Sequence, residues 1–156
     1  MFRFPHVCKF LVLPILLFAT PANAADAPDA KSAETKLLMD ATDKLTDVIK
    51  AQLDGDTAKL EKTAAEAISI YDQIIVMNPA NFKAINTRGN LKDTVLKGSG
   101  DADFIKAIEI TNAALSANAN DANAYYGRAV AERGLKKFDE ARADYKKAIE
   151  LNPAIS

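Results

Sequence analysis

The sequence predicts an all-α protein made of antiparallel helix pairs, and three observations lead to that prediction. Apolar residues recur at spacings of three and four over long stretches, which is typical of amphipathic helices. The alternation of apolar and polar residues that marks a half-buried strand does not occur, and β-branched residues are sparse. Short groups of residues also repeat along the chain, first after 40 positions and then after 34.

Residues 1–24 are predicted to be a cleavable signal peptide. Arg3 and Lys9 make the start of the chain cationic, an apolar run follows over residues 10–19, and Ala22 and Ala24 have the small-residue spacing of a cleavage site. A proline interrupts the apolar run, which is shorter than the roughly 20 residues that a membrane-spanning helix needs. We therefore expect a periplasmic or secreted protein that keeps no membrane span after cleavage; a retained anchor is the less favoured alternative.

The composition that remains after cleavage excludes several kinds of site. The only histidine and the only cysteine, His6 and Cys8, lie within the signal. We therefore expect no thiol nucleophile, no histidine base, no disulfide and no zinc site, and we assign no catalytic residue, cofactor or metal. Removal of Arg3 and Lys9 leaves 20 − 2 = 18 Lys and Arg against 21 Asp and Glu, so the net charge is 18 − 21 = −3. This balance argues against a nucleic-acid binder.

Residues 25–33 are polar, contain a proline and have nothing to bury, so we expect a flexible tail there and a helical domain over 34–156. The first helix of that domain ends at Asp54-Gly55-Asp56, where Asp56 or Thr57 is suited to cap the next helix. Its predicted apolar stripe consists of Leu38, Ala41, Leu45, Val48, Ile49 and either Gln52 or Leu53.

The second helix has an apolar stripe of its own and is expected to end at Asn78-Pro79, because proline cannot continue the hydrogen-bond ladder. This second stripe consists of Leu60, Ala64, Ala67, Ile68, Tyr71, Ile74 and Ile75.

Internal repetition extends the helix pair to the rest of the chain. Residues 84–89 (AINTRG) align with residues 124–129 (AYYGRA) at an offset of 40, and Ala107 aligns with Ala141 at an offset of 34. A helix-turn-helix unit of 34 residues is the period of one known kind of solenoid.

The residues of the last unit carry the resemblance. Ala124-Tyr-Tyr-Gly-Arg-Ala129, then Phe138-Asp-Glu-Ala141, then Ala148-Ile-Glu-Leu-Asn-Pro153 closely resemble a tetratricopeptide repeat (TPR). The resemblance implies a short right-handed solenoid of about three repeats, near residues 34–81, 82–121 and 122–155. The first repeat is atypical because its leading helix is long, and the middle one is expanded near residues 97–101.

The same resemblance predicts how the last repeat packs. Ala141 and Ala148 are expected where two helices cross closely, since larger side chains would push the helices apart. Tyr125, Phe138 and Tyr145 are expected to fill the space beside those crossings.

In the TPR family the first helix of each repeat lines a concave groove that holds a peptide or another protein. The residues that the alignment places there are Lys83, Asn86, Asn90, Tyr126, Val130 and Arg133. Asparagine amides can bind a peptide backbone, and lysine and arginine can attract a carboxylate. The family's full carboxylate-clamp pattern is not reproduced, and the alternative that these are ordinary solvated polar residues stays open.

Two other groups of residues can be interpreted either as structural or as functional. Ser99, between Gly98 and Gly100, resembles an exposed nucleophile, but a turn that lengthens the helix connection is favoured because no histidine base is present. The aspartate pairs 54/56 and 101/103 are expected to cap helices and not to bind calcium, since neither lies in a spaced calcium-binding loop.

The sequence therefore predicts a non-enzymatic protein-interaction module or scaffold, exported to the periplasm, that grips a partner protein or peptide through its concave face. The alternatives are a small-ligand or peptide carrier and an accessory subunit of a periplasmic enzyme complex. We also expect weak self-association or partner docking through the final helix, where Ile149, Leu151 and Ile155 are candidates for exposed apolar surface.

Overall fold

The computed structural model describes residues 28–155, so the predicted signal peptide lies outside the described residues. Within that range the chain is helical and contains no strand, which confirms the all-α prediction. The elements are α1 (Pro28–Asp54), α2 (Thr57–Met77), α3 (Phe82–Leu96), α4 (Asp101–Ala117), α5 (Ala122–Gly134), α6 (Phe138–Leu151) and the short 3-10 turn η2 (Pro153–Ile155).

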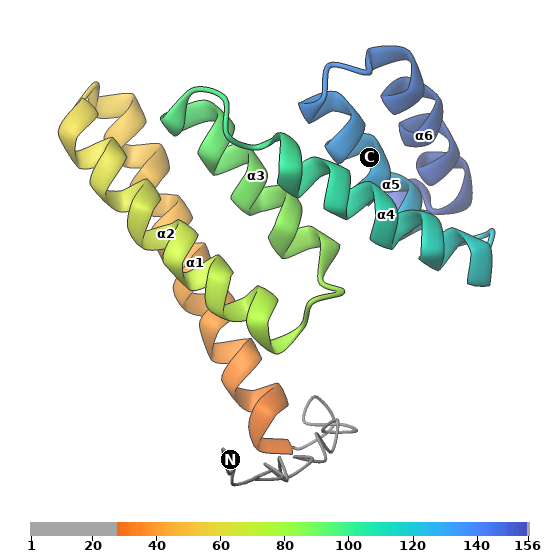
Figure 1. Cartoon of the computed structure of the whole chain (residues 1–156), viewed down its shortest axis with the longest axis horizontal. Helices are drawn as coiled ribbons and strands as arrows, with labels where there is room; N and C mark the ends of the chain where they lie inside the picture. Colours follow the sequence, from red (N-terminus) through yellow and green to blue (C-terminus); the bar gives the residue numbers. More distant parts are fainter. Residues whose placement is uncertain (1–27, 156) are drawn as a thin grey trace, which may run out of the picture.

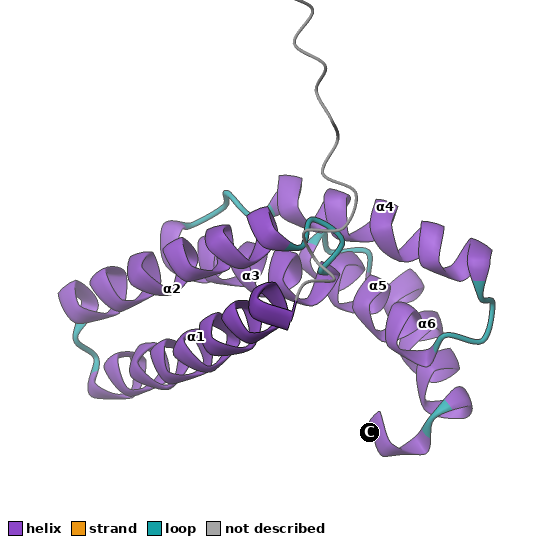
Figure 2. Cartoon of the chain, turned by 90° about the horizontal axis from the view of Figure 1, so that it is seen from below, coloured by secondary structure: helices purple, strands orange, loops and turns teal. Residues whose placement is uncertain are grey.

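The six helices form three pairs that follow the predicted repeats (Figure 1). Each helix packs against the next one along the chain, and α3 also packs against α5, so the pairs stack into a short array. At the edge of this array α1 packs mainly against α2 (Figure 2). The first helix is thus covered on fewer sides than α3 or α5.

Three of the helices start with the same capping chemistry. Asp56, Asn81 and Asp121 precede α2, α3 and α5, and the side chain of each accepts a hydrogen bond from the backbone N–H three residues later, at 2.9, 3.1 and 3.0 Å. Such a bond satisfies one of the backbone donors that a helix start leaves free. The prediction that Asp56 caps the second helix is confirmed.

The start of α1 differs from the sequence prediction. The helix begins at Pro28, so residues 28–33 of the expected tail are helical. Proline is well suited to the first position of a helix, and the acidic Asp29 lies in the first turn, where the helix dipole favours negative charge. Lys31 and Ser32 are nevertheless exposed, in agreement with the prediction that this segment has nothing to bury.

The apolar stripe of α1 is only partly buried. Ala41 and Val48 pack against α2 as predicted, but Leu38, Ile49 and Leu53 are exposed, Leu53 at 82% of its surface. The prediction was wrong for these three because α2 covers one narrow face of α1, which also includes the fully buried Ala51. The stripe predicted for α2 is confirmed, since all seven of its residues are buried or packed against the core.

In the last pair the small residues lie where the TPR resemblance predicts. Ala141 and Ala148 are buried at the crossing of α6 with α5. Tyr125 and Tyr145 are half-buried beside it. Phe138 does not fill this space: it is the first residue of α6 and is 59% exposed, so its predicted packing role is wrong.

The connection between α3 and α4 is a tight turn built on glycines. Gly98 has a φ of +111°, which glycine adopts without strain. A Cβ at Gly100 would lie 2.5 Å from the carbonyl oxygen of Gly89 and 3.0 Å from the ring of the fully buried Phe104. These contacts explain the Gly-Ser-Gly sequence as a packing requirement of the turn.

Candidate functional site

An open groove runs between α3 and α5, with a volume of about 500 Å³. All six residues that the sequence predicted for a partner-binding surface line it, since both helices are the first of their pairs and present matching positions to the same side. We call this site the α3–α5 groove. Its lining residues are Phe82, Lys83, Asn86, Thr87, Asn90, Asn123, Tyr126, Gly127, Val130, Arg133 and Ile155.

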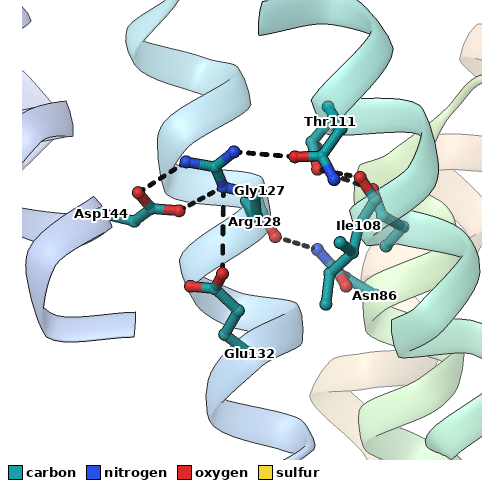
Figure 3. Close-up of polar contacts among 9 residues, drawn as sticks. Asn86, Ile108, Thr111, Gly127, Arg128, Glu132 and Asp144 are labelled. Carbon is teal, nitrogen blue, oxygen red and sulfur yellow. Dashed lines mark hydrogen bonds and ion pairs between the residues drawn. The ribbon is translucent and has the colours of Figure 1, made fainter. Parts of the chain in front are cut away.

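Asn86 joins the two helices at the bottom of the groove. Its side-chain Nδ2 donates a hydrogen bond of 2.7 Å to the carbonyl oxygen of Gly127 on α5 (Figure 3). The residue is only 4% exposed, and its Oδ1 is buried with no hydrogen-bond partner among the described residues. Asn86 is therefore no ordinary solvated residue, because it is buried and its amide links α3 to α5.

The close approach of the helices at this point depends on Gly127. A Cβ there would lie 2.3 Å from the ring of Phe82, which is the first residue of α3. The missing side chain lets the Phe82 ring pack on the α5 backbone, and it brings the Gly127 carbonyl within reach of Asn86.

The lining of the groove also combines aromatic surface with positive charge. Tyr126 is 41% exposed and packs edge-on against Tyr145 of α6, with ring centroids 5.5 Å apart. Lys83 and Arg133 are both exposed, and none of the lining residues is a carboxylate. The lining thus carries two cations and no compensating acid, so it favours an anionic ligand.

A half-buried arginine of α5 holds three helices together. Arg128 of α5 donates to both carboxylate oxygens of Asp144 on α6, at 2.5 and 2.8 Å, and to Oδ1 of Asn112 on α4, at 2.7 Å (Figure 3). The Tyr125 ring lies 5.4 Å from the guanidinium carbon. The guanidinium is planar with several fixed donors, so a single side chain can fix the relative positions of α4, α5 and α6.

The middle repeat contains the same device. Arg88 of α3 binds both carboxylate oxygens of Asp103 on α4 and Asp72 on α2, the latter at 2.6 Å. Lys92 adds a fourth contact, 3.1 Å from Asp103. These bonds raise the pKa of the Arg88 guanidinium, chiefly through the hydrogen bonds that it donates to Asp103.

The ion cluster around Arg88 shows that the predicted capping role of Asp103 is wrong. Asp103 is a buried ion-pair partner and not a helix cap; Gly100 occupies the cap position of α4 with no side-chain bond. Arg88 and Arg128 occupy matching positions of the aligned segments AINTRG and AYYGRA, so the repeat alignment already contained the pair.

Glu132, one turn after Arg128, is a buried acid that the sequence did not single out. Its Oε1 lies 3.9 Å from Nε of Arg128, while its Oε2 is buried without a hydrogen-bond partner among the described residues. Burial raises the pKa of this carboxyl to about 7, and the nearby charge of Asp144 acts in the same direction against the opposing charge of Arg128.

Within residues 28–155 no group of three or more His, Cys, Asp and Glu side chains is arranged to hold a metal ion. In the same range no helix is both long and apolar enough to cross a bilayer. The groove offers hydrogen-bond donors and acceptors, apolar surface and two cations, which suits it to hold an extended polar chain.

Comparison with known proteins gives one family match. The model of the tetratricopeptide repeat matches residues 122–154, which comprise α5, α6 and the start of η2. The last helix pair is therefore similar to a tetratricopeptide repeat, and over the described residues the chain is a helical repeat protein.

Three solved structures align with most of the chain, and two of them are TPRs. The first TPR of Spaghetti (RPAP3), bound to the HSP90 peptide SRMEEVD, is 24% identical over 72% of this chain and 79% of that chain, with a TM-score of 0.37. The second TPR of Spaghetti, bound to the same peptide, is 18% identical over 79% and 98%, with a TM-score of 0.36. The MamA RS-1 ArsTM double mutant is 18% identical over 81% and 77%, with a TM-score of 0.37.

Proposed function

We propose, from the similarity of α5 and α6 to a tetratricopeptide repeat, that this chain is a non-enzymatic interaction module that holds an extended segment of a partner protein in the α3–α5 groove. The repeat match supports a protein-interaction role in general. The observation that carries the finer proposal is the lining of the open α3–α5 groove, which combines asparagine amides, apolar surface and two cations with no carboxylate.

The rest of the lining fits a peptide with acidic character. Asn90 and Asn123 supply amides that can pair with a backbone on either side of Asn86. Val130 and Ile155 give apolar contacts for the peptide's side chains. Lys83 and Arg133 favour Asp, Glu or a terminal carboxylate over basic residues, because no acid in the lining offsets their charge.

The test is a selection of binding peptides from a random displayed library against the whole chain. We expect Asp and Glu to be enriched in the selected peptides and Arg133→Glu to weaken their binding at least tenfold. Arg142→Glu is the matched control, since Arg142 is exposed and lies on α6 outside the groove lining. Equal binding by both variants would assign the interaction to another surface.

A small-ligand carrier is the second candidate, because a volume of about 500 Å³ lies within the range of small-molecule sites. The groove is open and contains a row of amides from Asn86, Asn90 and Asn123, which favours a chain over a compact ligand. Co-purified material distinguishes the two: a bound peptide or protein supports the first candidate, and a bound small molecule supports the second.

We also propose that the module works outside the cytoplasmic membrane, in the periplasm or the medium, on the basis of the signal pattern in residues 1–24. N-terminal sequencing of the protein recovered from the periplasm should begin at Ala25. Recovery of Phe2 to Lys9 in the mature protein would contradict this location.

A further inference from the structure

The solvent face of α1 carries a long stripe without a single charge. The charged residues of this helix from Lys36 to Asp54 lie on other faces, mainly two rows at Lys36, Asp43 and Lys50 and at Asp40, Asp47 and Asp54. The uncharged positions share one side over about five helical turns, at helical spacing. They are Thr35, Leu38, Met39, Thr42, Leu45, Thr46, Ile49, Gln52 and Leu53.

Most of this stripe is open to solvent. Leu38, Met39, Ile49 and Leu53 are exposed, and Leu45 is half-buried at the border with α2. We call this surface the α1 stripe. On the final helix, which the sequence predicted to self-associate, Arg142 and Lys146 share a face with the exposed Ile149 and interrupt its apolar surface. No charged side chain interrupts the α1 stripe in this way, and exposed apolar side chains gathered on one face commonly mark an interface.

We propose that the α1 stripe binds the α1 stripe of a second copy of this chain, with the two helices antiparallel. A two-fold axis near Leu45 and Thr46 pairs Leu38 with Leu53 of the second copy, and Thr42 with its Ile49. Each large exposed side chain then faces an uncharged one, and the arrangement is closed because both copies use the same surface.

The charges beside the stripe identify the second copy as the occupant. In this register Lys50 of the second copy lies two residues from the position opposite Asp43, and its Asp54 lies one residue from the position opposite Lys36. Oppositely charged side chains are therefore neighbours across the interface, and each pair occurs twice. The charges of α1 thus complement those of a second, antiparallel α1.

Sedimentation of the full chain over a concentration series tests the proposal. The chain should form a dimer, and Ile49→Glu should raise the dissociation constant at least tenfold, because it places a charge in the middle of the stripe. Ile105→Glu is the matched control, since Ile105 is equally exposed but lies on α4. A chain that stays monomeric up to millimolar concentration would overturn the proposal.

A charge exchange tests the register. Asp43→Lys should weaken the dimer by placing two lysines opposite each other, and the double variant Asp43→Lys, Lys50→Asp should restore it. Circular dichroism checks that α1 remains helical in both. A dimer that is insensitive to Asp43→Lys would contradict the pairing.

Cross-linking tests the direction of the helices. In a Cys8→Ser background, which removes the only natural cysteine, Thr46→Cys should cross-link to itself with a short bismaleimide because it lies near the two-fold axis. Leu38→Cys alone should not, but a mixture of Leu38→Cys and Leu53→Cys chains should, since these positions lie about 22 Å apart along one helix. Self-linking of Leu38→Cys would show a parallel pair and overturn the proposal.

Discussion

The two ends of the array are built from the same helix-turn-helix unit but are held together differently. In the last pair, α5 and α6, alanines line the crossing and Arg128 binds the buried Asp144. In the first pair, α1 and α2 are longer, and the ion pairs between them, Lys44 with Glu66 at 2.6 Å and Lys59 with Asp54 at 3.9 Å, are exposed. The comparison teaches that the repeat pattern is most regular where neighbouring helices cover a pair on several sides, whereas α1 packs mainly against one neighbour.

Removal of Arg128 should produce the largest difference between the two ends. Arg128→Met leaves Asp144 and Glu132 buried without their cation, and breaking a buried ion pair in this way typically costs about 3–5 kcal/mol of unfolding free energy. Lys44→Met in the first pair should change stability little, because exposed ion pairs contribute little. Urea denaturation of both variants measures the difference.

Further substitutions test whether unpaired carboxylates cause the loss of stability in Arg128→Met. If the cost comes from stranded carboxylates, adding Asp144→Leu and Glu132→Gln to Arg128→Met should recover part of the lost stability. Equal losses for Arg128→Met and Lys44→Met would show that the two ends do not differ as described.

Overpacking of the last pair should have the next largest effect. Ala141→Leu forces three more carbon atoms into the crossing of α5 and α6 and is expected to cost about 1–3 kcal/mol. Ala143→Leu, on an exposed face of the same helix, should change stability by less than about 0.5 kcal/mol. Similar melting temperatures for these two variants would remove the support for a tight crossing at Ala141.

The two ends should also respond to pH in opposite directions. The pKa of Glu132 is raised to about 7 by burial, so the native state binds more protons than the unfolded state between about 4.5 and 7, and the stability from this group falls as the pH rises through that window. The pKa of Glu66 is lowered by its hydrogen bond to Lys44, so the stability from that pair is lost as the pH falls below the ordinary value of 4.5.

Glu132→Gln isolates the first of these effects. At pH 8, where the wild-type carboxyl is ionised and buried, the variant should be more stable by on the order of 1 kcal/mol. The fall in stability between pH 5 and pH 7 should become shallower. Thermal unfolding over that pH range checks both points, and an unchanged pH dependence would show that Glu132 is not the titrating group.

The contrast between the ends also explains what the sequence could predict. Burial at Ala141, Ala148, Tyr71 and Ile74 followed from helical spacing and the repeat period, because each of these residues is covered by a neighbour that the repeat requires. The exposure of Leu53 did not follow, since spacing shows which residues share a face but not whether another helix covers it.

Some features of the α3–α5 groove could likewise be predicted from the sequence, and others could not. The repeat alignment brought the six predicted residues to one groove, because matching positions of α3 and α5 point to the same side. The bond from Asn86 to Gly127 and the burial of Glu132 could not be predicted, since each depends on an interhelical distance set by other residues. The ion cluster of Arg128 could have been suspected from its repetition at Arg88.

The central claim is that a partner peptide lies in the α3–α5 groove, and hydrogen exchange with and without a selected acidic peptide tests it most directly. The account predicts that the peptide slows exchange of backbone amides in α3 and α5 near Asn86 and Gly127, with little change in α2. The protection should disappear with Arg133→Glu and persist with Arg142→Glu. Protection confined to α1 or α6, with α3 and α5 unchanged, would contradict the account.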